Sequence, residues 1–231
     1  MSKAGNNGCK ITALLPMKGH SERVPNKNLR LFAGKPLFHH VAAVLEKSPL
    51  IDTILINTDS QTIAENATKH FSKVRIIERP HSICGDYVPM NDIINYDLSC
   101  SKGLHFLQTH STNPLLTNET LEKAIQEYFL SNQPYDSLFS VTRLQSRLYW
   151  ESGEPVNHNP AELLRTQDLP PLFEENSNLY IFSKRSFFEA GNKRIGLKPK
   201  MFIMDALEAT DIDTEDNFCL AEAIYTIRNK L

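Results

Sequence analysis

Apolar runs and helical patterns alternate through the N-terminal part of this chain, and that alternation constrains the fold more than any other feature. Short apolar runs at 11–15, 52–57 and 74–77 have the composition of strands. Between them, 37–45 and 61–71 place their apolar side chains at helical spacing. Strands that alternate with helices form a parallel, doubly wound sheet, which binds ligands at the carboxyl ends of its strands. The sequence therefore predicts a three-layer α/β fold.

The rest of the chain continues this pattern and adds one irregular stretch. Further strands are expected at 105–108, 137–141, 178–182 and 201–204, and further helices at 91–101, 117–129, 185–190 and 214–228. Between 143 and 173, prolines interrupt the apolar periodicity. We interpret 143–173 as an arm inserted in a single domain that spans residues 1–231. On the last helix we expect four side chains to face the core, flanked by Phe218 and Tyr225: Leu220, Ala221, Ile224 and Ile227.

Composition excludes several classes of protein. The net charge of -2 gives no basic face, so we expect no nucleic-acid partner. No apolar run reaches membrane-spanning length, and the first ten residues, MSKAGNNGCK, contain no apolar leader. The four cysteines are widely spaced and form no CxxC pair, which argues against structural zinc and a disulfide framework. We therefore expect a cytoplasmic protein that does not bind membranes.

A loop rich in cations follows the first expected strand. Its basic residues are Lys18, Arg23, Lys27 and Arg30, and Ser21 and Asn28 add polar groups. A cationic loop between a strand and a helix is a common way to hold a polyphosphate, here a nucleoside triphosphate. Charge alone fits a solvated surface loop better. The order of the residues, described below, favours the phosphate site.

A second polar cluster, TDIDTEDN, lies at 210–217. Asp211 and Asp213 alternate on an expected extended segment, so both carboxylates should point to the same face. Two adjacent carboxylates repel each other unless a cation lies between them, and oxygen ligands of this kind suit Mg²⁺. The alternative is an ordinary helix start, with Asp213 as the cap and Glu215 and Asp216 in the first turn. That alternative leaves Asp211 unexplained.

The order of these motifs resembles the cytidylyltransferases that activate sialic acid and related 2-keto sugar acids. In the first loop the matching residues are Pro16, Lys18, Ser21, Pro25, Lys27, Asn28, Gly34, Lys35, Pro36 and Leu37. Two positions depart from the family, since Glu22 stands where it usually has Lys and Arg23 where it usually has Gly. Near the C-terminus, 211–215 resembles the family's Asp-x-Asp-Thr-Glu. The resemblance extends from 11 to 223.

Several weaker matches follow in the family's order. They are Arg79-Pro80, Gly85-Asp86, the QTHSTNPL segment at 108–115, the RTQD segment at 165–168, and Glu175-Asn176-Ser177. Counting back from Pro114 aligns Thr112 and Asn113 with the family's Thr-Ser, while Gln108 and His110 compete for one further position. Taken singly, each match is also typical of an ordinary loop. Their succession carries the resemblance.

The resemblance implies a mostly parallel sheet of the nucleotide-diphospho-sugar transferase type with a small dimerisation arm at 143–173. It implies a homodimer that uses CTP, a sialic-acid-like 2-keto sugar acid and Mg²⁺ held by Asp211 and Asp213. The implied catalytic residues are Lys18, Ser21, Arg23, Lys27 and Asp211. The implied nucleotide-binding residues are Pro16, Lys18, Ser21, Glu22, Arg23, Lys27, Asn28, Arg79 and Asp86. The implied sugar-binding residues are Thr112, Asn113, Arg143, Arg165, Gln167, Glu175 and Asn176.

The sequence leaves three points about the site and the reaction open. The cation for the sugar carboxylate could be Arg143, Arg147 or Arg165. A related nucleotidyltransferase could use another nucleotide, or a Kdo-like or non-acidic sugar. A non-catalytic sugar-nucleotide binding protein is also conceivable, because Glu22 introduces a negative charge into the phosphate loop.

Overall fold

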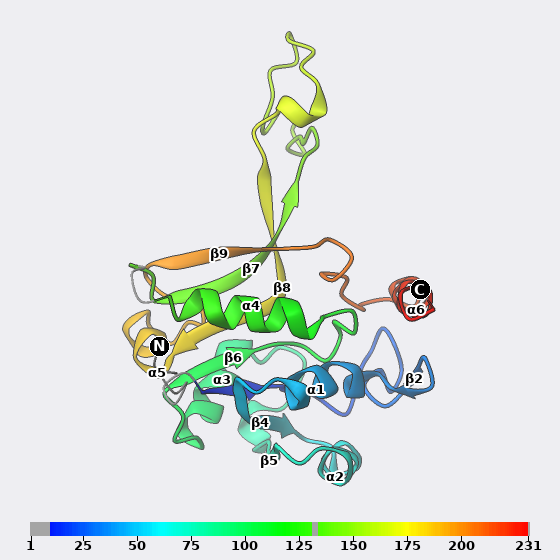
Figure 1. Ribbon diagram of the computed structural model, residues 1–231, viewed down its shortest axis with the longest axis vertical. Helices are drawn as coiled ribbons and strands as arrows, with labels where there is room; N and C mark the ends of the chain where they lie inside the picture. Colours follow the sequence, from blue (N-terminus) through cyan, green and yellow to red (C-terminus); the bar gives the residue numbers. More distant parts are fainter. Residues whose placement is uncertain (1–9, 131–133, 231) are drawn as a thin grey trace, which may run out of the picture.

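The computed structural model describes residues 10–130 and 134–230. Of the first ten residues, in which the sequence shows no apolar leader, residues 1–9 lie outside the described part. The described residues form a seven-stranded sheet in the order β5-β4-β1-β6-β8-β7-β9 (Figure 1). Its strands are β1 (Ile11–Leu14), β4 (Ile51–Thr58), β5 (Val74–Glu78), β6 (His105–Gln108), β7 (Ser137–Leu144), β8 (Leu172–Ser183) and β9 (Pro199–Met204). Only β8 runs antiparallel to its neighbours among these strands, so the predicted mostly parallel sheet is confirmed.

Helices cover both faces of the sheet, which gives the predicted three layers. They are α1 (Leu37–Lys47), α2 (Gln61–His70), α3 (Met90–Ser99), α4 (Asn118–Tyr128) and α5 (Lys184–Glu189). Helix α6 (Glu215–Arg228) lies apart from these layers. Alternation along β1 explains the layers, because Ile11 and Ala13 pack with α1, α2 and α4, whereas Leu14 packs with α3 and α5. Strands buried on both faces read as continuous apolar runs, as β1 does.

The helix starts follow from local sequence. Ser60 caps α2 by accepting from the Ile63 amide at 3.4 Å, and Thr117 caps α4 by accepting from the Thr120 amide at 3.2 Å. Both helices lie where the sequence predicts them, at 61–71 and 117–129. In the described part of the chain, no helix has the length and apolar character needed to cross a membrane.

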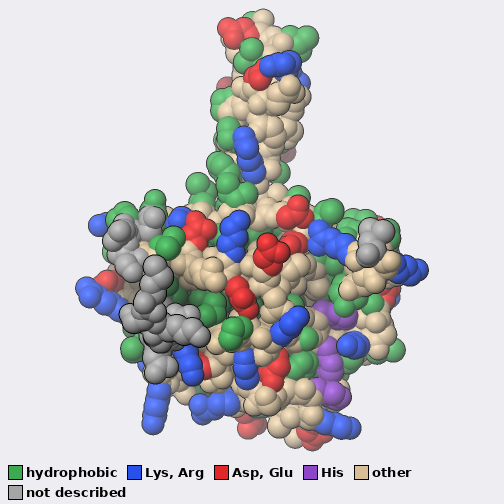
Figure 2. All heavy atoms as spheres, viewed as in Figure 1, with side chains coloured by type: hydrophobic (Ala, Val, Ile, Leu, Met, Phe, Trp, Pro, Cys, Tyr) green, Lys and Arg blue, Asp and Glu red, His purple; other side chains and the backbone are tan. Residues whose placement is uncertain are grey.

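The arm is an extension of β7 and β8 that projects from the body (Figure 1). Pairing continues out to Leu144 and Leu172, and the register shifts between Phe139 and Val141. Apolar side chains remain exposed along this arm (Figure 2), namely Tyr149, Trp150, Leu163, Leu164 and Phe173. An exposed apolar projection of this kind is typical of an interaction surface.

Helix α6 packs on the β2–β3 hairpin (Leu31–Phe32 and Lys35–Pro36) rather than on the sheet. The Phe32 ring meets the rings of Phe218 and Tyr225, each with a centroid distance of 5.5 Å. The predicted buried face is therefore wrong in part, because Leu220 is 56% exposed and Ile227 60% exposed. On the hairpin, α6 packs with Phe218, Ala221 and Tyr225 facing inward. This packing places the segment 210–217, here called the acidic segment, beside the first loop.

Candidate active site

A cavity of about 630 Å³ opens at the carboxyl ends of β1 and β6. These strands are neighbours at the point where the sheet order reverses, which is where doubly wound folds bind ligands. The cavity is lined by Pro16, Met17, Lys18, His20, Ser21, Glu22, Arg23, Lys27, Asn28, Arg79, Gly85, Asp86, Tyr87, Val88, Met90, Ile93, His110, Ser111, Thr112, Ser177, Arg194, Asp211 and Asp213. It therefore gathers all the nucleotide-binding residues that the resemblance implies, together with both metal candidates.

The first loop is held in shape by hydrogen bonds to its surroundings. The Gly19 amide donates to Asp59 Oδ1 at 2.6 Å, and a Cβ at position 19 would lie 2.9 Å from Ser60 Cβ, so this close approach needs glycine. The Asn28 side chain donates through Nδ2 to the Lys18 carbonyl at 3.0 Å and accepts through Oδ1 from Ser111 Oγ at 2.7 Å. Asn28 thus ties the loop to the segment after β6.

The acidic segment reaches the loop because Ile212 is buried between them. Its amide donates to the Thr112 carbonyl at 2.9 Å, and its carbonyl accepts from Lys27 Nζ at 2.6 Å. With Ile212 pointing into the core, Asp211 and Asp213 both face the cavity, as their alternation predicts. The helix cap is Thr214, not Asp213, which leaves both aspartates out of the cap.

Cations of the first loop form ion pairs with carboxylates, including one from the acidic segment. Asp213 Oδ1 lies 2.8 Å from Arg23 Nη2 and 3.7 Å from Lys27 Nζ. Lys18 pairs with Asp86, and its hydrogen bond lowers the pKa of that carboxyl. Burial lowers the pKa of Lys27, against the attraction of the aspartates. An incoming polyphosphate would compete with these carboxylates for the loop cations.

Asp211 has the surroundings of a cation ligand. Its Oδ1 is buried without a hydrogen-bond partner among the described residues. Burial raises the pKa of Asp211, and the charge of Asp213 acts in the same direction. In the described part of the chain no three metal-ligating side chains cluster. Magnesium binds through one or two carboxylates together with substrate phosphates and water, so the pair suffices and the residues fit Mg²⁺.

A buried network supports Arg79 behind the cavity. Arg79 Nε donates to Asn57 Oδ1 at 2.7 Å, and Asn57 Nδ2 donates to Asp97 Oδ1 at 2.6 Å. Arg79 also donates to the Asn57 carbonyl at 3.0 Å and the Met17 carbonyl at 3.3 Å. Asp97 is fully buried, its Oδ2 has no partner among the described residues, and burial raises its pKa to about 7.

This network predicts a pH-dependent stability. The folded state binds the Asp97 proton more tightly than the unfolded chain, so stability falls as the pH rises from about 4 to 7. Between pH 5 and 8 the loss is on the order of 2 kcal/mol, or roughly 4–8 °C in Tm. Because asparagine does not titrate, Asp97→Asn should not show this loss of stability. The Tm of the variant minus the Tm of wild type should therefore increase by roughly 4–8 °C from pH 5 to pH 8. Thermal melts at both pH values test this.

The control for this prediction is Asp92→Asn, on an exposed side chain of the same helix. It should keep the wild-type pH trend. Parallel pH trends for Asp97→Asn and wild type would show that the carboxyl does not carry the effect.

The predicted sugar-binding residues are less well gathered than the nucleotide-binding residues. Thr112 lines the cavity, but Asn113 is buried beside it, with Nδ2 3.5 Å from the Thr210 carbonyl. Asn176 fixes the base of the arm, since its side chain bonds Ser140 at 2.6 Å and Thr142 at 3.0 Å. The others lie outside the cavity of a single chain: Glu175 on β8, and Arg143, Arg165 and Gln167 on the arm. Their roles remain predictions.

The cavity also contains residues to which the resemblance assigns no role in binding the nucleotide, the sugar or the metal. Ser177 lines it and has a φ of 57°, a left-handed conformation that glycine adopts more readily than serine. Arg194 lines it from the segment between α5 and β9, where no local pattern distinguishes it. Of Gln108 and His110, only His110 lines the cavity, and Gln108 Nε2 lies 3.1 Å from His110 Nε2.

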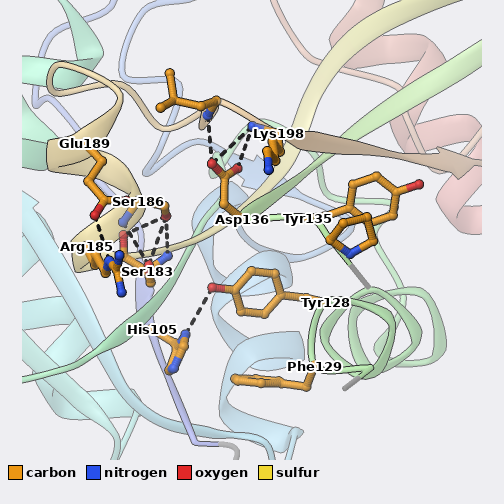
Figure 3. Close-up of a pocket in the computed structure, with 12 residues that line it drawn as sticks. His105, Tyr128, Phe129, Tyr135, Asp136, Ser183, Arg185, Ser186, Glu189 and Lys198 are labelled. Carbon is orange, nitrogen blue, oxygen red and sulfur yellow. Dashed lines mark hydrogen bonds and ion pairs between the residues drawn. The ribbon is translucent and has the colours of Figure 1, made fainter. Parts of the chain in front are cut away.

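A second hollow, of about 560 Å³, lies elsewhere on the molecule (Figure 3). Several of its polar groups are paired. Asp136 accepts from the Leu197 and Lys198 amides, and Arg185 pairs with Glu189 at 2.7 Å. The predicted nucleotide-binding residues and both predicted metal ligands line the first cavity and not this hollow, which favours the first cavity as the active site.

This chain is similar in sequence to several known proteins. The N-acylneuraminate cytidylyltransferase A of Danio rerio is 29% identical over 92% of this chain, and the chain spans 50% of that protein. The CMP-N,N'-diacetyllegionaminic acid synthase of Legionella pneumophila is 24% identical, and the pseudaminic acid cytidylyltransferase of Campylobacter jejuni 22%. Those two alignments each cover 96% of this chain and 98% of the relative.

Solved structures share the fold. A CMP:2-keto-3-deoxy-manno-octonic acid synthetase complexed with CTP superposes with a TM-score of 0.68 at 14% identity, covering 96% of this chain and all of that one. A 4-diphosphocytidyl-2C-methyl-D-erythritol synthase from Anaerococcus prevotii gives 0.63 at 12% identity, covering 94% of this chain and 96% of its own. The family model described as cytidylyltransferase matches residues 12–230. This nucleotidyltransferase therefore belongs to the cytidylyltransferase family.

Proposed function

We propose that this chain transfers CMP from CTP to a sialic-acid-like 2-keto sugar acid and releases diphosphate. One observation carries the proposal: loop cations and two carboxylates from opposite ends of the chain converge in one cavity. The relatives' names support the reaction class, since they include enzymes for acylneuraminic, legionaminic and pseudaminic acids.

The reaction forms a bond from the anomeric hydroxyl oxygen to the α-phosphorus and breaks the bond from that phosphorus to the β-phosphate oxygen. The hydroxyl proton is released and diphosphate leaves. Such a transfer needs charge neutralisation and in-line placement more than a covalent intermediate. Lys18, Arg23 and Lys27 would hold the phosphates, with the Ser21 hydroxyl as a further donor.

Asp211 and Asp213 would hold the magnesium ion. When bound, the ion supplies positive charge at the phosphate and lowers the pKa of a nearby hydroxyl. The buried Oδ1 of Asp211, which has no hydrogen-bond partner among residues 10–130 and 134–230, supports this assignment. Arg23 stands within reach of Asp213, which supports the view that it replaces the family's usual lysine in this loop.

The arm supports a further part of the proposal, a cytoplasmic homodimer. Trp150 is 64% exposed and Leu163 94% exposed, and burying such side chains against a second copy would be favourable. The arm would then lie near the partner's cavity, where Arg143, Arg165 and Gln167 could contact the sugar.

The proposed reaction is tested by diphosphate release. The protein is incubated with Mg²⁺, each of the four ribonucleoside triphosphates, and a panel of nonulosonic acids, Kdo-like acids and neutral sugars. We expect release only with CTP and a nonulosonic acid. Turnover with another nucleotide, a Kdo-like acid or a neutral sugar would contradict the proposed specificity, and CTP binding without turnover on any sugar would favour a non-catalytic binding protein.

A further inference from the structure

Arg194 is a fixed cation in the wall of the cavity. Its guanidinium carbon lies 3.6 Å from the centroid of the Tyr180 ring, and its Nη1 donates to Gln108 Oε1 at 2.6 Å. Tyr180 is itself held, because its hydroxyl bonds Glu175 and lies 3.2 Å from Ser177 Oγ. Stacking and the Gln108 bond orient the guanidinium plane without neutralising its charge.

Arg194 differs from the cations of the phosphate loop in its partners. Lys18 pairs with Asp86, and Arg23 and Lys27 lie close to Asp213. Among the described residues, Arg194 forms no ion pair with a carboxylate. A guanidinium carries five N–H donors, and its bond to Gln108 uses one of them. A half-buried charge with unused donors is suited to an anionic ligand.

The position of Arg194 indicates which substrate that ligand belongs to. The phosphate loop follows β1, and Arg79 follows β5, so the donor nucleotide's contacts come from the β5-β4-β1 half of the sheet. Gln108 and Tyr180, which hold Arg194, belong to β6 and β8 in the other half. Arg194 therefore lies on the side of the cavity left to the acceptor.

His110, the ionisable neighbour on that side, does not share the charge. Burial, together with the charges of Arg194 and Lys27, lowers the pKa of His110 to about 4. Its ring is neutral at pH 7. The arginines of the arm do not line the cavity of a single chain, and Arg165 is paired with Asp168 at 2.7 Å.

Resting on the proposed function, we infer that Arg194 binds the carboxylate of the acceptor sugar acid. The planar guanidinium can offer two parallel N–H donors to a carboxylate, which fixes both its position and its orientation. Arg194 would thereby select acids over neutral sugars and place the anomeric hydroxyl toward the α-phosphate.

Steady-state kinetics of Arg194→Gln test this inference. The variant should raise the KM for the acid about 10–100-fold, because a charge-assisted pair is lost. The KM for CTP should stay within about twofold of wild type. Wild type should also prefer the free acid to its methyl ester, and Arg194→Gln should lose that preference. Arg185→Gln, on an exposed arginine outside the cavity, is the matched control and should behave as wild type.

The outcomes separate this inference from the proposed function. If wild type releases diphosphate with no acid, the proposed function fails and the inference fails with it. If wild type is active, but Arg165→Gln raises the KM for the acid and Arg194→Gln does not, the arm binds the carboxylate and only the inference is overturned. If Arg194→Gln does not fold, Arg194→Lys takes its place. It keeps the charge without the planar fork, and an unchanged KM for the acid in that variant would overturn the inference.

Discussion

Replacing Asp211 by Asn should abolish turnover while leaving the fold at least as stable. Its buried Oδ1 has no hydrogen-bond partner in the described part of the chain, and burial raises its pKa. The carboxylate therefore destabilises the fold, and we expect it to be kept for function. Losing a ligand of the proposed magnesium ion removes several kcal/mol of charge stabilisation, which corresponds to a loss of roughly 10³-fold in kcat/KM. The measurements are diphosphate release and a thermal melt on the same sample.

The matched control is Asp216→Asn, on an exposed aspartate of the same segment outside the cavity. It should keep wild-type activity and lose at most a fraction of a kcal/mol of helix-dipole stabilisation. Full activity in Asp211→Asn would refute the metal assignment. A large fall in the Tm of Asp211→Asn would show instead that the Asp211 carboxylate stabilises the fold.

The second large effect is expected for Lys27→Met. Lys27 links the first loop to the segment at 210–217, since its Nζ donates to the Ile212 carbonyl at 2.6 Å and lies 3.7 Å from Asp213. Methionine keeps the apolar stem and removes the charge. We expect kcat/KM to fall about 100-fold or more, since a charge-assisted donor to the phosphates is lost and the Ile212 carbonyl is left without its partner.

This prediction is checked with single-turnover diphosphate release at saturating CTP, which separates chemistry from binding. Lys69→Met, on an exposed lysine of α2, provides the control and should match wild type. Activity of Lys27→Met within threefold of wild type would remove Lys27 from the phosphate site.

The sequence predicts the core of this fold well because β1, β4 and β5 are apolar runs separated by capped, periodic helices. These signals are local. The orientation of α6 could not be predicted in the same way. Its sequence offers two apolar faces, and contact with Phe32, distant in the chain, decides in favour of the face with Phe218 and Tyr225.

The site, too, contains residues that a local motif predicts and residues that no motif predicts. The phosphate loop and the two aspartates carry short motifs, so sequence could find them and their convergence could be expected. Arg194 follows no motif, and its significance comes from Tyr180 and Gln108, which approach it only in the folded chain. Conversely, Asn176 matched a motif, yet its side chain is occupied by Ser140 and Thr142 at the base of the arm.

The most direct test of the proposed reaction identifies its product. Phosphorus NMR of the protein with Mg²⁺, CTP and a nonulosonic acid should show a CMP phosphodiester and diphosphate appearing in equal amounts. Both signals should be absent when the acid is omitted. Unchanged CTP across the whole panel of nonulosonic acids, under conditions where CTP is bound, would contradict the account.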